Sequence, residues 1–409
     1  MKKYILLILP VLTSCTTDIP EWALEDQSTS ENELPVILDY SLTSHDYRQL
    51  LQPIVDFGNI VEELGLNYNT KLHTNTSLAI ADFNEDSYPD LYFYTNFDGD
   101  ESKVTPSFFI YDPFTKKYVL DSSILSFQEF EPYHSRKTIV GDFNLDGKPD
   151  VIRAAGAHIV PGVSNITLST KDGYEFKGLH NIPTSTYHTL SSGDIDNDGD
   201  LDVFFGGTYD DGFAINNGDG TFEWVRSYDI IKDFKVPNSV DGDHGMYGVW
   251  TSEIVDVNND GWDDLVLSGI YDKDEIHLNG ITIIYNQSGN FDYNKREVIL
   301  VDDSIIITTD TAIVDFNNDG FKDLVTLSGT TYDNMVVEAY VRNSSLNMFN
   351  KVEVETPYSS VSNRVWITVR DLDNNGRFEI TEQESSLYEV SQTIRDAITW
   401  EWDGKKFSK

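Results

Sequence analysis

The chain has 409 residues, a formal net charge of −40 at pH 7 and a single cysteine. So large an acidic excess argues against nucleic acid or an anionic membrane surface as a partner, because both are bound through basic patches. One cysteine excludes a disulfide within the chain, so we expect metal ions to crosslink the fold.

The N-terminus has the pattern of a targeting signal. Lys2 and Lys3 precede an apolar run that ends at Leu12 and is too short to span a bilayer. Cys15 follows three residues later, as in a bacterial lipoprotein signal, whose cysteine is lipidated and becomes the first mature residue. Because Thr16 is not the Asp that directs retention in the inner membrane, we expect a lipid anchor in the outer membrane. A chance cysteine behind an ordinary signal peptide is the alternative.

The residues between this signal and the main domain fall into two parts. Residues 15–33 are acidic and polar and predict a tether. Residues 34–70 form an N-terminal segment that we expect to pack on the main domain. Within it, apolar spacing from Asp46 to Leu64 predicts one or two helical pieces outside the repeats, with Ser44 as a cap and an interruption at Pro53.

An acidic nine-residue pattern recurs six times from residue 82 onward. The richest copy, Asp194–Asp202, holds five carboxylates and leads directly into an apolar strand. Carboxylates this dense repel one another unless a cation or water separates them, and the apolar flank favours a cation. Oxygen ligands at positions one, three, five and nine, a backbone carbonyl at seven and Gly at six suit calcium.

The predicted calcium ligands of the six loops are Asp82, Asn84, Asp86 and Asp90; Asp142, Asn144, Asp146 and Asp150; Asp194, Asp196, Asp198 and Asp202; Asp256, Asn258, Asp260 and Asp264; Asp315, Asn317, Asp319 and Asp323; and Asp371, Asp373, Asn375 and Glu379. The first loop has Ser87 where Gly is expected, and the sixth has Asn375 and the longer Glu379. We expect about six structural calcium ions, held most weakly in these two loops.

The loops repeat at intervals of roughly 60 residues, which indicates one repeated array rather than several unrelated domains. A strand enters each loop, a second leaves it, and two more alternating strands follow. Phe213–Trp224 predicts a hairpin that turns at Asp219-Gly220, and Ala397–Phe407 predicts another. Each repeat therefore has four strands.

These loops, with the hairpin at Asn216–Phe222, resemble the FG-GAP/VCBS repeat family, which is also found in the propeller head of integrin alpha chains. An EF-hand is the alternative for one copy, but its Glu at position twelve and flanking helices are missing. The resemblance covers roughly residues 70 to 407 and implies an all-β propeller of four-stranded blades, with calcium in the loop between the two innermost strands. We take residues 71–409 as this domain, with six blades, or seven if residues 34–70 add part of one.

Histidines recur just before the inner strands, which line the channel of a propeller. His134, His188 and His244, with Arg136 and Tyr247, are our candidate ligand-binding residues at one mouth of this channel. The same groups, with Tyr187 and Arg364, could act in a polysaccharide lyase. We favour the reading in which they line the channel without catalysing a reaction.

Phosphate-binding loops, His-Glu-x-x-His and Gly-x-Ser-x-Gly are absent from the sequence. We therefore expect a monomeric, lipid-anchored, calcium-stabilised propeller that binds a polysaccharide or a protein and touches the membrane only through its lipid. The alternatives are a polysaccharide lyase on the same scaffold and an assembly factor of the cell envelope. The fold does not choose among them.

Overall fold

The structure is a computed structural model that describes the following residues: 38–51, 77–95, 105–115, 117–121, 123–127, 135–155, 162–207, 211–234, 248–270, 280–299, 305, 307–331, 334–343, 348–357, 365–384 and 399–409. The predicted signal peptide, Cys15 and the tether lie outside them. None of the helices in these ranges is long and apolar enough to cross a membrane.

The described chain is all-β and consists of antiparallel meanders whose strands pair in chain order. The first two meanders are β1 (Ser77–Ala81), β2 (Asp90–Thr95), β3 (Thr105–Asp112) and β4 (Lys117–Asp121), then β6 (Ser135–Gly141), β7 (Asp150–Ala155), β8 (Asn165–Thr170) and β9 (Gly173–Gly178). The next two are β10 (Tyr187–Gly193), β11 (Asp202–Gly207), β12 (Gly212–Asn216) and β13 (Phe222–Arg226), then β15 (Gly248–Val255), β16 (Asp264–Ile270), β17 (Ile281–Ile284) and β19 (Glu297–Ile299). Next come β20 (Ile307–Val314), β21 (Asp323–Thr331), β22 (Asn334–Asn343) and β23 (Met348–Val354), then β24 (Val365–Arg370), β25 (Glu379–Glu384), β26 (Thr399–Trp402) and β27 (Lys406–Ser408).

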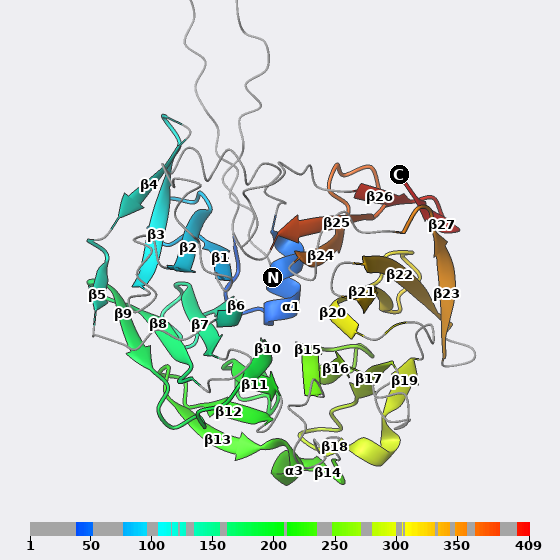
Figure 1. The fold of residues 1–409 in the computed structure, drawn as a ribbon, viewed down its shortest axis with the longest axis horizontal. Helices are drawn as coiled ribbons and strands as arrows, with labels where there is room; N and C mark the ends of the chain where they lie inside the picture. The colour runs from blue at the N-terminus through cyan, green and yellow to red at the C-terminus, as the bar shows by residue number, and fades with distance from the viewer. Residues whose placement is uncertain are drawn as a thin grey trace, which may run out of the picture. The chain divides into compact units, whose positions relative to one another are not determined.

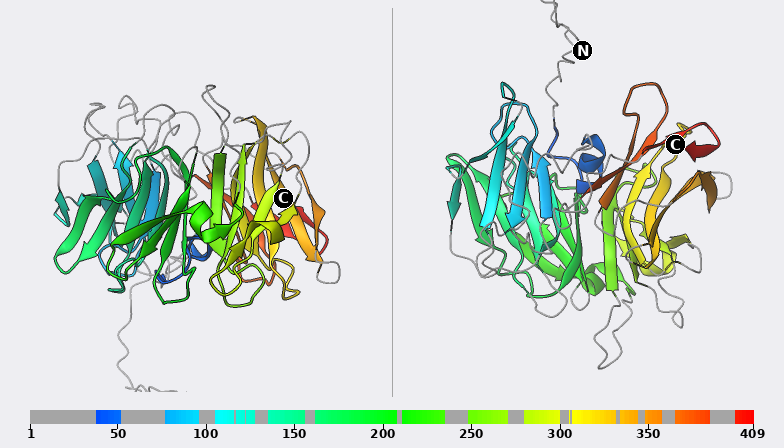
Figure 2. Two further views of the ribbon diagram at one scale, coloured as in Figure 1. Left: turned by 90° about the horizontal axis from the view of Figure 1, so that it is seen from below. Right: turned by 45° about the horizontal axis from the view of Figure 1, so that its top comes forward.

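The first strands of these meanders, β1, β6, β10, β15, β20 and β24, contact one another in turn. Figure 1 shows them around a common centre, with later strands progressively farther out, and Figure 2 shows the sheets side by side around the ring. This is the arrangement of a β-propeller. The predicted all-β, propeller-like architecture is confirmed, whereas the number of blades stays a prediction. Both predicted hairpins are confirmed and form β12–β13 and β26–β27.

Three parallel pairings link strands outside the meander order. The strand β5 (Leu125–Phe127) pairs with β9, β14 (Ile231–Lys232) pairs with β18 (Phe291–Asp292), and β23 pairs with β27. Two short helices, α3 (Ser227–Ile230) and η2 (Tyr293–Lys295), flank β14 and β18. The alternation of apolar residues did not predict these pairings, because it reports which face of a strand is buried and not what lies beside its edge.

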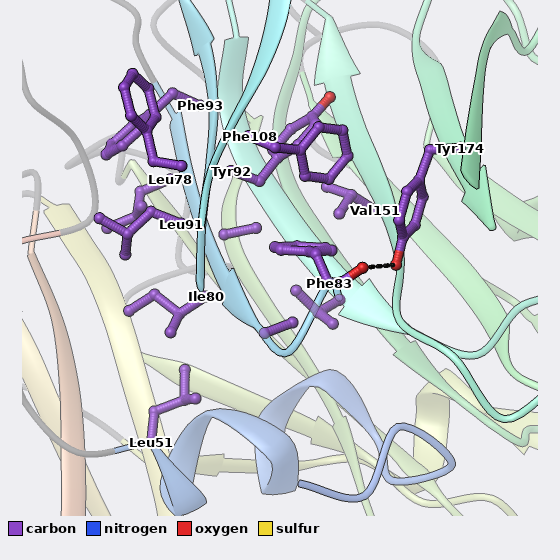
Figure 3. Close-up of a cluster of buried hydrophobic side chains, with 14 of the residues drawn as sticks. Leu51, Leu78, Ile80, Phe83, Leu91, Tyr92, Phe93, Phe108, Val151 and Tyr174 are labelled. Carbon is purple, nitrogen blue, oxygen red and sulfur yellow. Dashed lines mark hydrogen bonds between the residues drawn. The ribbon is translucent and has the colours of Figure 1, made fainter. Parts of the chain in front are cut away.

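The hydrophobic core lies between neighbouring sheets. Figure 3 shows one such contact. Phe83, in the loop after β1, and Phe108 of β3 lie against Val151 of β7 and Tyr174 of β9 in the second sheet. The Tyr174 hydroxyl also donates to the Phe83 carbonyl at 3.4 Å. Each further pair of sheets shares a comparable cluster of buried side chains. Burial of one such aromatic side chain contributes about 2 to 3 kcal/mol, so packing between sheets is a main source of stability.

The helix α1 (Ser44–Leu50) lies in the centre of the ring and contacts β6, β10, β15 and β24 (Figure 1). This part of the segment packs on the main domain as expected, but in the centre of the ring and not outside the repeats. The rest of the predicted helical stretch, with the interruption at Pro53, lies outside the described residues. The cap also differs from the predicted Ser44, because the Thr43 hydroxyl accepts from the Asp46 amide at 3.1 Å. The buried side chains His45, Arg48 and Gln49 explain the error: polar residues in a short helix predict an exposed surface, and here they bond to inner strands.

Candidate metal centres

The six acidic loops occupy the same place in the fold. Each joins the first and second strand of a meander, so that its ninth position is the first residue of the second strand. The loop of residues 194–202, for example, runs from the end of β10 at Gly193 into β11. The expected location between the two innermost strands is therefore confirmed.

The first-position carboxylate organises each loop by accepting two backbone amides. One oxygen accepts from the amide of position five at 2.9 to 3.1 Å. The other accepts from the amide of position six at 2.7 to 2.9 Å. The fifth-position side chain in turn accepts from the amide of position seven at 2.8 to 3.2 Å. These bonds hold the side chains of positions one and five against the backbone of their own loop in all six copies.

Every loop places two residues at positive φ. At position six the residues are Ser87 (72°), Gly147 (83°), Gly199 (99°), Gly261 (86°), Gly320 (91°) and Gly376 (86°). At position four they are Glu85 (62°), Leu145 (59°), Asn197 (65°), Asn259 (59°), Asn318 (57°) and Asn374 (57°). Ser87 therefore has the positive φ of the glycines that stand at this position in the other loops. The turn at position four was not predicted, although Asn in four of the six loops was a signal, because Asn tolerates this region better than most residues.

The ninth-position carboxylate joins the loop to the sheet. In loop two, Asp150 accepts from the Phe143 amide at 2.8 Å and from the Ser169 amide of β8 at 2.6 Å. Asp202 makes the same bridge between Ile195 and Asn216. Burial raises the pKa of these carboxyls, to about 7 for Asp150 and about 8 for Asp202.

Two loops bring three carboxylates together. Ligand atoms of Asp194, Asp196 and Asp202 lie within 4.8 Å of one another, as do those of Asp371, Asp373 and Glu379. These are the loops with Asp rather than Asn at position three. In loop three, burial and then the charges of Asp198 and Asp194 raise the pKa of Asp196. A divalent cation between these groups would offset both effects.

The sixth loop has a further feature that fits a cation. Glu379 is 5% exposed, and its Oε2 accepts from the Leu372 amide at 2.7 Å. Within the described part of the chain its Oε1 is buried and has no hydrogen-bond partner. A buried carboxylate oxygen without a partner is costly unless it binds a cation or a proton. The residues of this loop therefore fit a metal ion despite Asn375 and the longer ninth side chain.

A model of the FG-GAP-like repeat family matches residues 142–205 and 194–267. Residues 142–267 match this repeat family. This stretch contains the second, third and fourth loops, and the other three loops share its backbone geometry. No curated protein matches the chain.

Solved structures resemble the fold of the chain that carries these FG-GAP-like repeats. The first is a lectin from Agrocybe aegerita, described as showing specific recognition of non-reducing terminal N-acetylglucosamine, with 14% identity, 82% of this chain and 87% of that chain covered, and a TM-score of 0.50. AofleA from Arthrobotrys oligospora has 8% identity, coverages of 83% and 86%, and a TM-score of 0.43. CoXyl43, a GH43 β-xylosidase/α-arabinofuranosidase from a compost metagenome, has 10% identity, coverages of 68% and 94%, and a TM-score of 0.39. The lectin shows the fold alone.

Neighbouring meanders are also linked by asparagines that we did not predict. The Asn216 amide group donates to the carbonyl of Phe143 in the preceding loop at 2.9 Å, and Asn286 donates to Ile195 at 2.8 Å. Both asparagines are buried; Asn216 is the last residue of β12, and Asn286 follows the end of β17 by two residues. Asp263 adds a bond between loops four and three, because its Oδ2 accepts from the Asp194 amide at 3.0 Å. Neighbouring loops are therefore coupled through the sheets.

The candidate ligand-binding residues are only partly described. His188 lies near the start of β10, and its ring stacks on Trp250 of β15 with centroids 4.4 Å apart. His134, His244 and Tyr247 lie outside the described residues, as does Arg364 of the lyase alternative, and only the backbone of Arg136 is described. Tyr187 is buried and donates to the Pro183 carbonyl at 3.0 Å. Whether these groups share one mouth stays a prediction.

Proposed function

We propose that the chain is a six-bladed propeller that holds calcium in its six acidic loops and binds a carbohydrate ligand. The observation that carries the calcium assignment is the shared geometry of the loops, in each of which the side chains of positions one and five accept from the same backbone amides, as in loop two. Asp and Asn oxygens at four positions, a carbonyl at the seventh and one or two waters would give the six to eight oxygens that calcium takes. Magnesium suits these loops less, because it demands a stricter octahedral shell.

The charges of the chain are consistent with this role for calcium. The six loops hold 19 predicted ligand carboxylates, and in the third and sixth loops three of them have ligand atoms within 4.8 Å of one another. Calcium bound there would stabilise the fold by favouring the ionised carboxylates that burial opposes. The ions would be structural and would take no part in a reaction.

The carbohydrate assignment rests on the lectin whose fold this chain resembles, which recognises terminal N-acetylglucosamine. In this chain α1 fills the loop-side end of the central channel, where Ser44 and His45 bond to the amides of Ser192 and Ile313. His188 and Trp250 lie at the opposite ends of β10 and β15. We assign the ligand to this opposite mouth, with His134, Arg136, His244 and Tyr247 as its further contacts.

A glycan-binding screen tests the carbohydrate assignment. The full chain should bind at least one class of glycan in calcium, with N-acetylglucosamine-terminated glycans screened first. His188→Ala should weaken binding at least tenfold, whereas Tyr228→Ala, an exposed aromatic residue on α3, should leave it unchanged. Absence of glycan binding by calcium-loaded protein would contradict the proposal, and unchanged binding by His188→Ala would contradict the assigned mouth.

We also propose that Cys15 carries a lipid that holds the propeller in the outer membrane. The support is the sequence pattern ahead of Cys15 and its being the only cysteine. The described chain begins at Leu38 and reaches the loops at once, because the Asp82 amide donates to the Tyr40 hydroxyl at 2.9 Å. The first described residues therefore contact the loop face, which is opposite the mouth to which we assign the ligand.

A further inference from the structure

Residues 40–51, which include α1, bond to sheets from both ends of the chain. Within the described residues, no strand pairing joins the sheet of β1–β4 to the sheet that contains β24–β27. The first strands of the other neighbouring sheets pack against each other around the ring. Residues 40–51 bond to both sides of the junction between the first and the last sheet, at Ile80 of β1 and at Val369 of β24.

On the first sheet, two tyrosines of this segment bond to the backbone. The Tyr47 hydroxyl donates to the Ile80 carbonyl at 2.7 Å, and the Tyr40 hydroxyl accepts from the Asp82 amide at 2.9 Å. Tyr47 is buried, and its ring lies 5.7 Å from that of Tyr40. Tyr47 and Leu51 also belong to the buried apolar cluster that contains Leu78 and Ile80 of β1, so apolar packing and hydrogen bonds together join this segment to the first sheet.

On the last sheet, the end of α1 bonds to β24. The Gln49 side-chain oxygen accepts from the Val369 amide at 2.7 Å. The Arg370 guanidinium donates to the carbonyl of Leu50, and to that of Gln49 at 3.4 Å. Gln49 is buried, so loss of its oxygen would leave the Val369 amide without a partner in the interior.

Between these contacts, Arg48 anchors the segment in the centre of the ring. Its guanidinium lies 2.8 Å from Asp310 of β20 and 3.4 Å from Glu253 of β15. Lys137 of β6 pairs with Glu253 at 3.1 Å, so two cations face two carboxylates. Glu253 and Asp310 are buried, and removal of Arg48 would leave two buried carboxylates facing a single cation.

The contacts also share a register with the acidic loops. Tyr47, Ser44, His45 and Gln49 bond to the backbone of residues 80, 192, 313 and 369. Each of these residues stands two positions before the first ligand of a loop, at 82, 194, 315 and 371. The segment therefore forms hydrogen bonds to four inner strands at equivalent positions, each two residues before a predicted metal ligand.

We propose that residues 40–51 are a clasp that closes the ring by joining β1 to β24 through the channel, and that docking of the clasp is coupled to cation binding in the loops. The second part rests on the proposed calcium sites. Coupling follows because a cation that orders a loop also orders the backbone two residues away, to which the clasp bonds, and linkage makes this effect reciprocal.

A distance measurement across the junction tests the clasp. Spin labels are placed at Lys117→Cys and Lys405→Cys, two exposed positions on the first and the last sheet, in the full chain with Cys15→Ser. The otherwise unaltered chain should give one narrow distance distribution. Arg48→Met and Gln49→Ala should broaden it toward longer distances below the unfolding temperature. Arg226→Met and Gln287→Ala, which alter exposed residues, should leave it unchanged.

The outcomes separate the two parts of the proposal. If the distance distribution of Gln49→Ala stays narrow, the clasp proposal is overturned, whatever Arg48→Met shows. If Arg48→Met fails to fold, Gln49→Ala still tests the clasp. It removes only one uncharged hydrogen-bond acceptor and leaves no buried charge without its partner. Saturating calcium should narrow the distribution of Gln49→Ala again. If calcium stabilises the unaltered chain without this narrowing, the coupling is wrong and the proposed function stands. If calcium does not bind at all, the proposed function and the coupling fail, whereas the distances still test ring closure.

Discussion

Replacement of Ser87 by Gly should stabilise the metal-free protein, because Ser87 has the positive φ that glycine adopts freely. Its φ is 72°, and the corresponding residue in the other five loops is Gly. A side chain in this region costs about 1 to 2 kcal/mol. Glycine gives back about 0.5 to 1 kcal/mol through the greater freedom of the unfolded chain. The expected net gain in the free energy of unfolding is therefore about 0.5 to 1 kcal/mol.

The reverse change at Gly261 is the matched control. Its φ is 86°, and a Cβ added there meets no atom within 4 Å, so Gly261→Ala changes the backbone preference without a clash. It should lower the free energy of unfolding by a similar amount. Both variants are unfolded with denaturant in chelator, which removes any effect of metal affinity. Shifts in the same direction, or a loss of stability in Ser87→Gly, would refute the argument from loop geometry.

Three further predictions concern the metal sites and the anchor. Asp196→Ala should lower the melting temperature in calcium but hardly in chelator, whereas Asp172→Ala, in an exposed turn, should change neither; an equal loss in both conditions would refute the ligand role. Burial raises the pKa of Asp202 to about 8 and that of Asp264 to about 7, so the folded state retains protons that the unfolded chain releases near its ordinary value of 3.8. In chelator the free energy of unfolding should therefore fall between about pH 4 and pH 8, by at most about 1.4 kcal/mol per pH unit for each group. Calcium should remove this fall, and denaturant unfolding at pH 5 and pH 8 measures it; a rise in chelator would contradict the assignment. Cys15→Ser should move the protein from the membrane to the soluble fraction of cells, and continued sedimentation with membranes would contradict lipidation.

The sequence predicted the loops well because their chemistry is local. A ligand at every second position, glycine at the sixth and an apolar strand on either side are all visible within about a dozen residues. The same is true of the hairpin at Asp219-Gly220, which forms as predicted. Position four was missed because residues as different as Glu85, Leu145 and Asn197 adopt the same positive φ there.

The centre of the ring was not predicted, because its interactions join residues that are far apart in the chain. Arg48 bonds to Asp310 and Glu253, more than two hundred residues away. In the sequence these three residues look like ordinary surface charges, and only their convergence on the channel shows that they are buried. The parallel pairing of β23 with β27 was missed for a related reason. The alternation of apolar and polar residues shows which face of a strand is buried, but it does not show which strand pairs with its edge.

The most direct test of the account is thermal unfolding of the full chain with and without chelator, together with its metal content by elemental analysis. Six loops with one geometry predict about six calcium ions per chain and a large loss of thermal stability on chelation. Protein that contains no calcium after dialysis against it, and that melts at the same temperature in chelator, would contradict the account.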